Sequence, residues 1–311
     1  MIEEIPEALD GERIDRVVSM QLDISRSAVR RLIEQGDDCL DGKVATTRSS
    51  RVHTGQMLAI NNIELLFDEV ALEADASIEV PLLHVDEDVI VVDKPVGLVV
   101  HPGAGNNTGT ICQGLLATFP EIAEVGEPSR PGIVHRLDKG TSGAFMVARS
   151  AEAYESLVDQ LRDRSVGRRY LAFGWGDPDT EGGVIDAPIG RAIRDPTRMV
   201  VKTDGKPART HYQVLARWHD PTISLVECRL ETGRTHQIRV HMAAIHHPVV
   251  GDARYGGGRG DQGLTRPALH ASDLSFDHPA TGERLSFHSP LPSDLVEFVD
   301  GLGAPTSGGL E

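Results

Sequence analysis

Residues 131–143 read Pro-Gly-Ile-Val-His-Arg-Leu-Asp-Lys-Gly-Thr-Ser-Gly, and this stretch decides how the rest of the chain is interpreted. Two apolar residues lead into a polar loop, and the residues that follow, 144–148, have the composition of a strand. His135, Arg136 and Asp138 are therefore expected on a turn between two strands, where binding and catalytic side chains are common. The competing interpretation is a purely structural turn, in which Asp138 bonds only the local backbone.

Strand and helix signals alternate on both sides of this turn without a repeating βαβ order. Strands are expected at 89–92, 98–100, 144–148, 170–175, 211–216 and 223–230. Helices are expected at 151–164, after the capping residue Ser150, and at 235–245, where apolar residues recur at helical spacing. The pattern predicts an α+β fold: a mixed, largely antiparallel central sheet with flanking helices.

The first sixty or so residues predict a separate, small α/β module. Helical spacing is found over 14–22 and again after Ser25, and short strands follow around an Asp41-Gly42 turn. Arg26 and Arg30 lie four residues apart on one face of the second helix. We expect three segments in the chain: residues 1–75 (the module and an acidic linker), 76–300 (the large domain) and 301–311 (a disordered tail).

Length and composition exclude several classes of protein. The chain has 311 residues, of which 40% are hydrophobic and 25% charged, as in ordinary globular proteins. Its apolar runs are far shorter than the roughly 18 residues of a membrane-spanning helix, and its acidic start is unlike a secretory signal. The three cysteines are widely spaced, which favours buried thiols over disulfides. A cytoplasmic protein without a membrane segment is expected.

Charge is distributed unevenly along the chain. The net charge is −16, and residues 60–93 contain ten acidic residues and neither lysine nor arginine. Residues 191–217 contain seven basic residues and two acidic ones, a local balance of +5. A basic surface on an acidic protein is one interpretation of this asymmetry, and an ordinary solvated face is the other.

Other motif interpretations fit the spacing poorly. His135-Arg-Leu-Asp138 resembles a kinase catalytic loop, but its aspartate comes one residue late and the companion motifs are missing. The glycines of residues 103–109 do not have the spacing of a dinucleotide-binding loop. His241, His246 and His247 lack a cysteine or carboxylate at ligand spacing, so no metal is expected.

The stretch His135–Gly143 resembles the HRLDxxTSG motif of the RluA-type pseudouridine synthases. Three further segments resemble motifs of that family in the same order: residues 94–102, 169–172 and 230–241. The resemblance extends from about residue 81 to 298. It implies a pseudouridine synthase fold and an enzyme that isomerises uridine in RNA without a cofactor.

The N-terminal unit, from about residue 11 to about residue 63, is similar to an S4 RNA-binding domain. Within the RluA type this domain accompanies the enzymes of large-subunit rRNA, RluC and RluD. The resemblance therefore implies large ribosomal subunit (23S) rRNA as the substrate, and a monomer is the default assembly.

The family resemblance also implies roles for individual residues. Asp138 would be the catalytic carboxylate, Arg234 its basic partner, and Tyr170 the aromatic residue that packs on the flipped uracil. Three residues of the same motifs would bind the substrate: Arg136, His135 and Ile238. Seven basic residues would bind RNA outside the catalytic centre: Arg26, Arg30, Arg191, Arg194, Arg198, Lys202 and Arg209; Lys206 belongs to the same basic stretch.

Two other classes of function remain open at this point. One is a non-catalytic S4-containing protein of RNA binding or ribosome assembly. The other is a nucleoside hydrolase, which would need a second acid beside Asp138 to activate water. Residues 131–143 contain no second acid.

Overall fold

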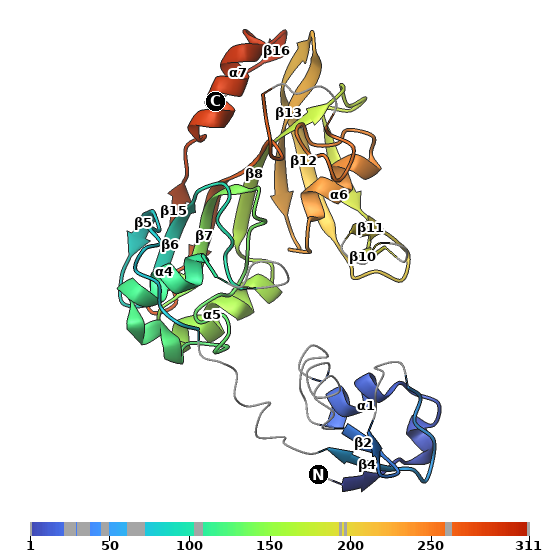
Figure 1. Ribbon diagram of the computed structural model, residues 1–311. Helices are drawn as coiled ribbons and strands as arrows, with labels where there is room; N and C mark the ends of the chain where they lie inside the picture. Colours follow the sequence, from blue (N-terminus) through green and yellow to red (C-terminus); the bar gives the residue numbers. More distant parts are fainter. Residues whose placement is uncertain are drawn as a thin grey trace. The chain divides into compact units, whose positions relative to one another are not determined.

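The computed structural model describes residues 2–21, 29, 38–44, 50–60, 72–102, 108–192, 195, 198–258 and 263–309. Contacts divide the chain into two compact units. The first, 1–71, is drawn in blue in Figure 1, and the second, 72–311, in colours from cyan to red. The second unit begins a few residues before the expected boundary at 76, because Leu72 already packs against its core. Most of the acidic linker, 64–71, lies outside the described residues.

The first unit is built around a small antiparallel sheet. Its strands are β1 (Ile2–Glu4), β2 (Asp38–Leu40), β3 (Lys43–Val44) and β4 (Met57–Ile60), in the order β1-β4-β2-β3. The predicted first helix is confirmed as α1 (Ile14–Gln21), whose Ile14, Val17 and Val18 are fully buried. The predicted β2–β3 turn is also confirmed, since Asp41 and Gly42 both have positive φ angles. The expected second helix, with Arg26 and Arg30, falls outside the described residues.

The second unit is dominated by one large sheet. Its strands are β5 (Leu82–Val85), β6 (Val89–Lys94), β7 (Ser142–Ala148), β8 (Gly167–Trp175), β9 (Gly182–Asp186), β12 (Arg209–His219), β13 (Thr222–Leu230), β14 (Leu269–Asp277), β15 (Arg284–His288) and β16 (Ser307–Gly308). The main path runs β16-β12-β13-β8-β14-β7-β6-β5. Among the described strands every neighbouring pair is antiparallel except β7 with β14. The predicted mixed, largely antiparallel α+β fold is confirmed.

Alternating side chains of β6 and β7 build two hydrophobic cores, one on each face of the sheet. Ile90 and Val92 pack in the core that α4 (Ile111–Thr118) also enters. Val89 and Val91 pack in the core that contains buried residues of α5 (Ala151–Arg162). All seven residues of β7 are buried, so the strand that leaves the 131–143 turn is fixed from both sides.

Two predicted helices of the second unit are confirmed with small shifts in their bounds. Helix α5 begins after Ser150, whose Oγ accepts the Ala153 N–H at 3.1 Å, as the capping pattern predicted. Helix α6 (Gln237–Ala244) begins two residues later than expected, after His236, whose φ angle of 58° is left-handed. Buried His241 of α6 is bonded to Thr210 and to the Ala187 carbonyl, so it packs as a structural residue.

Two sequence predictions for the second unit are wrong. No strand forms at 98–100: Val99 makes only an isolated bridge to Thr110. The segment predicted as a disordered tail is ordered through residue 309, because α7 (Ser293–Leu302) buries Leu295 and β16 pairs with β12. None of the helices in the described part of the chain is both long and apolar enough to cross a membrane.

Candidate active site

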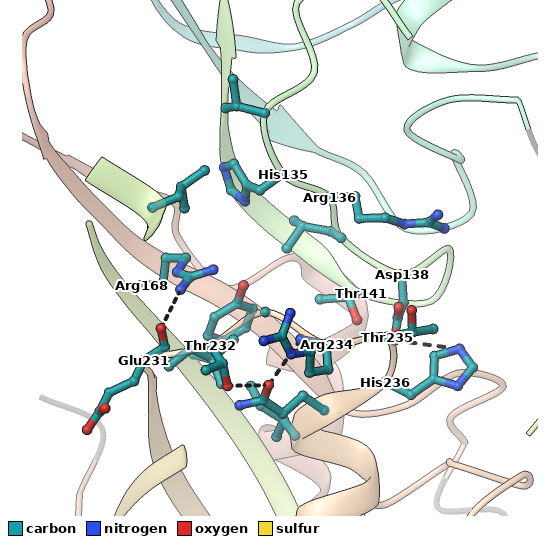
Figure 2. Close-up of a pocket in the computed structure, with 18 of the residues that line it drawn as sticks. His135, Arg136, Asp138, Thr141, Arg168, Glu231, Thr232, Arg234, Thr235 and His236 are labelled. Atoms are coloured by element: carbon teal, nitrogen blue, oxygen red, sulfur yellow. Dashed lines mark hydrogen bonds and ion pairs between the residues drawn. The ribbon is translucent and has the colours of Figure 1, made fainter. Parts of the chain in front are cut away.

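A cavity of about 550 Å³ forms where three parts of the second unit meet (Figure 2). The 131–143 turn contributes one wall, the end of α5 and the start of β8 a second, and residues 230–239 a third. Of the six residues expected to catalyse or bind the substrate, all line this cavity: Asp138, Tyr170, Arg234, Arg136, His135 and Ile238. The tertiary fold therefore brings together three segments that are far apart in the sequence.

The turn that carries Asp138 is held by a buried lysine. Lys94 is 1% exposed, and its Nζ donates to the carbonyls of Pro95 at 2.9 Å, Lys139 at 3.3 Å and Thr141 at 2.7 Å. Burial lowers the pKa of Lys94 from 10.5 to about 7, although nearby Asp138 acts in the opposite direction. One amino group thus bonds two carbonyls of the turn just after Asp138 and ties them to Pro95, and in its protonated form it carries positive charge near the Asp138 carboxylate.

We predict that Lys94→Met removes a pH dependence of stability. The unfolded chain binds more protons than the folded chain between pH 7 and 10.5, so the free energy of unfolding should rise with pH there. The variant should lack this rise and should lose about tenfold or more in activity, because the Pro95 carbonyl and the two turn carbonyls, of Lys139 and Thr141, lose their donor. Denaturant unfolding of both proteins from pH 6 to 9 measures the first effect; parallel slopes would contradict it.

Asp138 is paired with an arginine of helix α6. Arg239 Nη1 lies 3.1 Å from Asp138 Oδ2, while its Nε and Nη2 hold Asp252 at 2.7 and 3.0 Å. Burial by itself lowers the pKa of Arg239, but the Asp252 and Asp138 carboxylates outweigh it and the net shift is upward. The guanidinium therefore stays charged and fixes the Asp138 carboxylate in direction.

The expected pairing of Asp138 with Arg234 is wrong. Arg234 lines the cavity, but its Nε donates to the Pro207 carbonyl at 3.0 Å and no carboxylate of the described residues pairs with it. The reason is the start of α6: Arg234 precedes the helix, whereas Arg239 lies inside it and reaches the turn. The sequence carried a signal for this in Gln237-Ile-Arg239, where the arginine follows the expected pocket residue Ile238 directly.

Beside the carboxylate, the cavity has an aromatic and an aliphatic wall. Tyr170 on β8 is 6% exposed, and burial raises its pKa to about 12, which keeps the phenol neutral. Ile238 in the first turn of α6 is 4% exposed and lines the same cavity. A flat, uncharged group can pack between such side chains while one of its edges faces Asp138.

His135 and Arg136, adjacent in sequence, have different surroundings. His135 Nε2 accepts the Met146 N–H at 3.1 Å, and burial lowers the pKa of this histidine to about 3, so it is neutral. Arg136 is exposed, and its guanidinium lies 3.1 Å from the His101 ring. Within the described part of the chain no carboxylate pairs with Arg136, which leaves its charge available to a ligand.

Sequence reasoning missed His236 and Tyr255, which connect the Asp138 pair to a neighbouring hairpin. His236 Nε2 lies 4.0 Å from Asp138, and its Nδ1 is 2.7 Å from the Tyr255 hydroxyl. The guanidinium groups of Arg239 and Arg198 both contact the Tyr255 ring, at 5.0 and 5.3 Å from its centre. Arg198 immediately precedes β11 (Met199–Val201), which pairs with β10 (Ile189–Arg191).

Of the seven basic residues expected to bind RNA, the structure describes four, three of them in or beside this hairpin and Arg209 at the start of β12. Arg191 and Arg198 are exposed, Lys202 is 3.0 Å from Asp204, and Arg209 lies near Glu231 at 3.6 Å. Arg194 falls outside the described residues. The structure therefore places four of the seven expected residues and describes three not at all: Arg26, Arg30 and Arg194.

The cavity itself is far more basic than the sequence pattern suggested. It is lined by seven arginines, 130, 136, 162, 164, 168, 234 and 239, and by only two carboxylates, Asp138 and Glu231. Five of the seven were not among the expected site residues; three of these, Arg162, Arg164 and Arg168, come from one basic stretch, 162–169, that the sequence analysis did not single out. On a chain of net charge −16, such a cavity selects for an anionic ligand.

Two family comparisons agree with this architecture. Residues 88–244 match the RNA pseudouridylate synthase family, and residues 12–58 match the S4 domain. The first match contains the 131–143 turn, Tyr170 and Arg239; the second lies in the first unit.

Individual relatives match over nearly the whole chain. The uncharacterized RNA pseudouridine synthase YlyB of Bacillus subtilis is 43% identical over 293 residues, 94% of each chain. Ribosomal large subunit pseudouridine synthase D of Xanthomonas campestris is 42% identical, covering 96% of this chain and 91% of that one. The solved structure of human RNA pseudouridylate synthase domain containing 1 is 28% identical with a TM-score of 0.60, covering 77% of this chain and 94% of that one. This chain belongs to the RNA pseudouridine synthase family and carries an S4 domain.

Proposed function

We propose that this protein converts specific uridines of large-subunit (23S) rRNA to pseudouridine, with Asp138 as the catalytic carboxylate. The observation that carries the proposal is the Asp138–Arg239 pair at 3.1 Å, set in a basic cavity beside Tyr170 and Ile238. The choice of rRNA is supported by relatives at 41–42% identity that are named ribosomal large subunit pseudouridine synthase D.

The chemistry asks for one well-placed carboxylate. Isomerisation breaks the bond between N1 of uracil and C1′ of ribose, turns the base and joins C5 to C1′; the hydrogen on C5 leaves and N1 gains one. The step is neither a redox reaction nor a hydrolysis, so we propose no cofactor and no metal. Arg239 supplies a counter-charge beside the Asp138 carboxylate and holds it in one direction, as a nucleophile requires.

The substrate uridine must leave its stack to reach Asp138. Stacking of the extruded uracil on Tyr170 is worth about 1–3 kcal/mol, which offsets much of the unstacking cost. Ile238 closes the other side of the base, and His135 shapes the slot as a neutral residue. Arg136, exposed and without an acid partner in the described part of the chain, is placed to occupy the gap left in the RNA.

RNA outside the cavity is proposed to lie along basic side chains that contact phosphate and do not read bases. Arg191, Arg194, Arg198, Lys202 and Arg209 would form this contact beside the catalytic cavity, and Arg26 and Arg30 would form it in the S4 domain. The enzyme would act as a monomer in the cytoplasm, where ribosomal subunits assemble.

Release of tritium from RNA labelled at C5 of uridine tests the reaction, and pseudouridine mapping in rRNA from cells lacking the protein identifies the sites. A binding or assembly protein would release no tritium. A nucleoside hydrolase would liberate free uracil. Pseudouridine in rRNA from wild-type cells, at positions unmodified in the deletion strain, is the result expected here.

We predict that a chain lacking residues 1–71 folds but binds rRNA more weakly. The remaining unit keeps its own sheet and both of its large hydrophobic cores, so its thermal unfolding should stay cooperative. Filter binding should show affinity reduced about tenfold or more and a shallower dependence on salt, because phosphate contacts are lost. Loss of the cooperative transition, or unchanged affinity, would contradict the separate role of the S4 domain.

A further inference from the structure

A second buried arginine of the cavity, Arg168 on β8, lacks the acid partners that Arg239 has. Arg168 is 8% exposed, its Nη2 donates to the Glu231 carbonyl at 3.4 Å, and its Nε has no hydrogen-bond partner among the described residues. No carboxylate in the described part of the chain lies within ion-pair distance of it. The pKa of Arg168 is shifted downward, mainly by burial, whereas the carboxylates beside Arg239 make the net shift of its pKa upward.

A buried guanidinium without a counter-charge is costly to the folded chain. The neighbouring residues leave room for it: a Cβ at position 233 would stand 2.8 Å from Nη1, and Gly233 has none. The charge also faces the cavity, because Arg168 lines it with Tyr170, two residues further along β8 (Figure 2). The Arg168 charge lowers the stability of the free protein and lies in a cavity that binds a ligand, so it points to an anion as its partner in the bound state.

Arg168 continues a path of positive charge from the surface. Arg162, the last residue of α5, and Arg164 just after it are exposed and line the same cavity, and each has a carboxylate partner. Arg168 and Tyr170 are two residues apart on β8, which corresponds to about 7 Å along a strand. This separation is similar to that between the base and the phosphate of one nucleotide. Uracil itself is neutral, so the anion nearest to a base on Tyr170 is the RNA backbone.

We propose that Arg168 binds a phosphate that flanks the flipped uridine and so positions its ribose against Asp138. This inference rests on the proposed function and adds to it a phosphate subsite inside the catalytic cavity. In the complex, the phosphate gives the Arg168 guanidinium the counter-charge that it lacks among the described residues of the free protein. Phosphate binding here would favour extrusion of the nucleotide over binding of the stacked strand.

The test uses a large-subunit rRNA fragment joined from two pieces, with one neutral methylphosphonate either 5′ or 3′ to the uridine that the wild-type protein modifies. For the wild type, kcat/KM should fall about 10- to 100-fold at one of the two positions, the range for a hydrogen bond to a charged group. For Arg168→Met, kcat/KM on unmodified RNA should be similarly low, and the same methylphosphonate should change it less than about twofold.

Stability separates this role from a structural one. Arg168→Met should unfold at the same temperature as the wild type or higher, because it removes an unpaired buried charge. The matched control is Arg169→Met, one residue along β8 and outside the cavity, which pairs with Glu227 and with Asp273 at 3.0 Å. This control should melt at a lower temperature and keep the wild-type sensitivity to methylphosphonate.

Several outcomes would overturn the phosphate subsite. One is a wild-type enzyme that tolerates methylphosphonate at both positions, which would assign Arg168 to the base instead. Another is equal sensitivity in the wild type and Arg168→Met. A wild-type protein that leaves the unmodified fragment unconverted would count against the proposed function itself, so the two failures are distinguishable. The methylphosphonate measurement on the wild-type protein tests the phosphate subsite even if a variant folds poorly.

Discussion

Asp138→Asn should abolish pseudouridine formation while leaving RNA binding intact. The amide keeps the shape of the side chain but removes its charge and its ability to act as a nucleophile. The other side chains near the turn offer no substitute: Lys139 and Thr141 lack a carboxylate, and Glu231 is paired with Arg164 and His211. We expect a rate loss of at least about a thousandfold, which corresponds to about 4 kcal/mol in the activation free energy.

The measurement is pseudouridine formation in an rRNA transcript, alongside filter binding on the same preparation. Stability should change by about 1 kcal/mol or less, because Arg239 retains Asp252 as a partner at 2.7 Å. RNA affinity should be unchanged or slightly higher, since a negative charge facing phosphate is removed. Appreciable synthesis by a folded Asp138→Asn protein would refute the mechanism.

Arg239→Met should damage both activity and stability. The change leaves Asp252, 1% exposed, and Asp138 without their shared guanidinium. Removing one partner of a buried ion pair typically costs about 3–5 kcal/mol in the free energy of unfolding. Turnover should fall at least about a hundredfold in whatever fraction stays folded, because Asp138 loses its fixed direction.

Arg239→Lys and Arg234→Ala are the controls. Lysine restores charge but cannot hold two carboxylates with a planar fork, so it should recover stability more than turnover. Arg234→Ala should affect RNA affinity and its salt dependence more than turnover, as its guanidinium contacts only the Pro207 carbonyl among the described residues. If Arg234→Ala proved more damaging to turnover than Arg239→Met, the pairing seen here would not be the catalytic one.

Much of the local structure was predictable because its signals are short-range. Helix α5 follows from its Ser150 cap and apolar stripe, and the β2–β3 turn from Asp41-Gly42. Strand β14, which joins β8 to β7 at the centre of the sheet, was not predicted. Its sequence is rich in polar and small side chains and carries no clear strand pattern. Its central place in the sheet comes from its pairing with neighbouring strands.

The C-terminal residues were mispredicted for a similar reason. Residues 303–309 are rich in glycine and small residues, a composition typical of disorder. They are ordered because β12 offers a free edge to β16 and because Trp218 donates to the Gly303 carbonyl at 2.9 Å. Such partners lie about ninety residues away in sequence, beyond the reach of local composition.

By itself, the sequence determined the α+β class, the S4-like module and the 131–143 turn that carries Asp138. Each rests on contiguous residues whose types and spacing carry the signal, whereas Tyr170 and Ile238 were expected in the pocket from the family resemblance. Only the tertiary structure decided that Arg239, not Arg234, holds Asp138, because that depends on where α6 begins and which way it faces. It alone showed Arg168 as a buried charge without an acid partner in the described part of the chain. Ion pairing and burial depend on contacts between segments that are distant in sequence, so the local sequence pattern does not predict them.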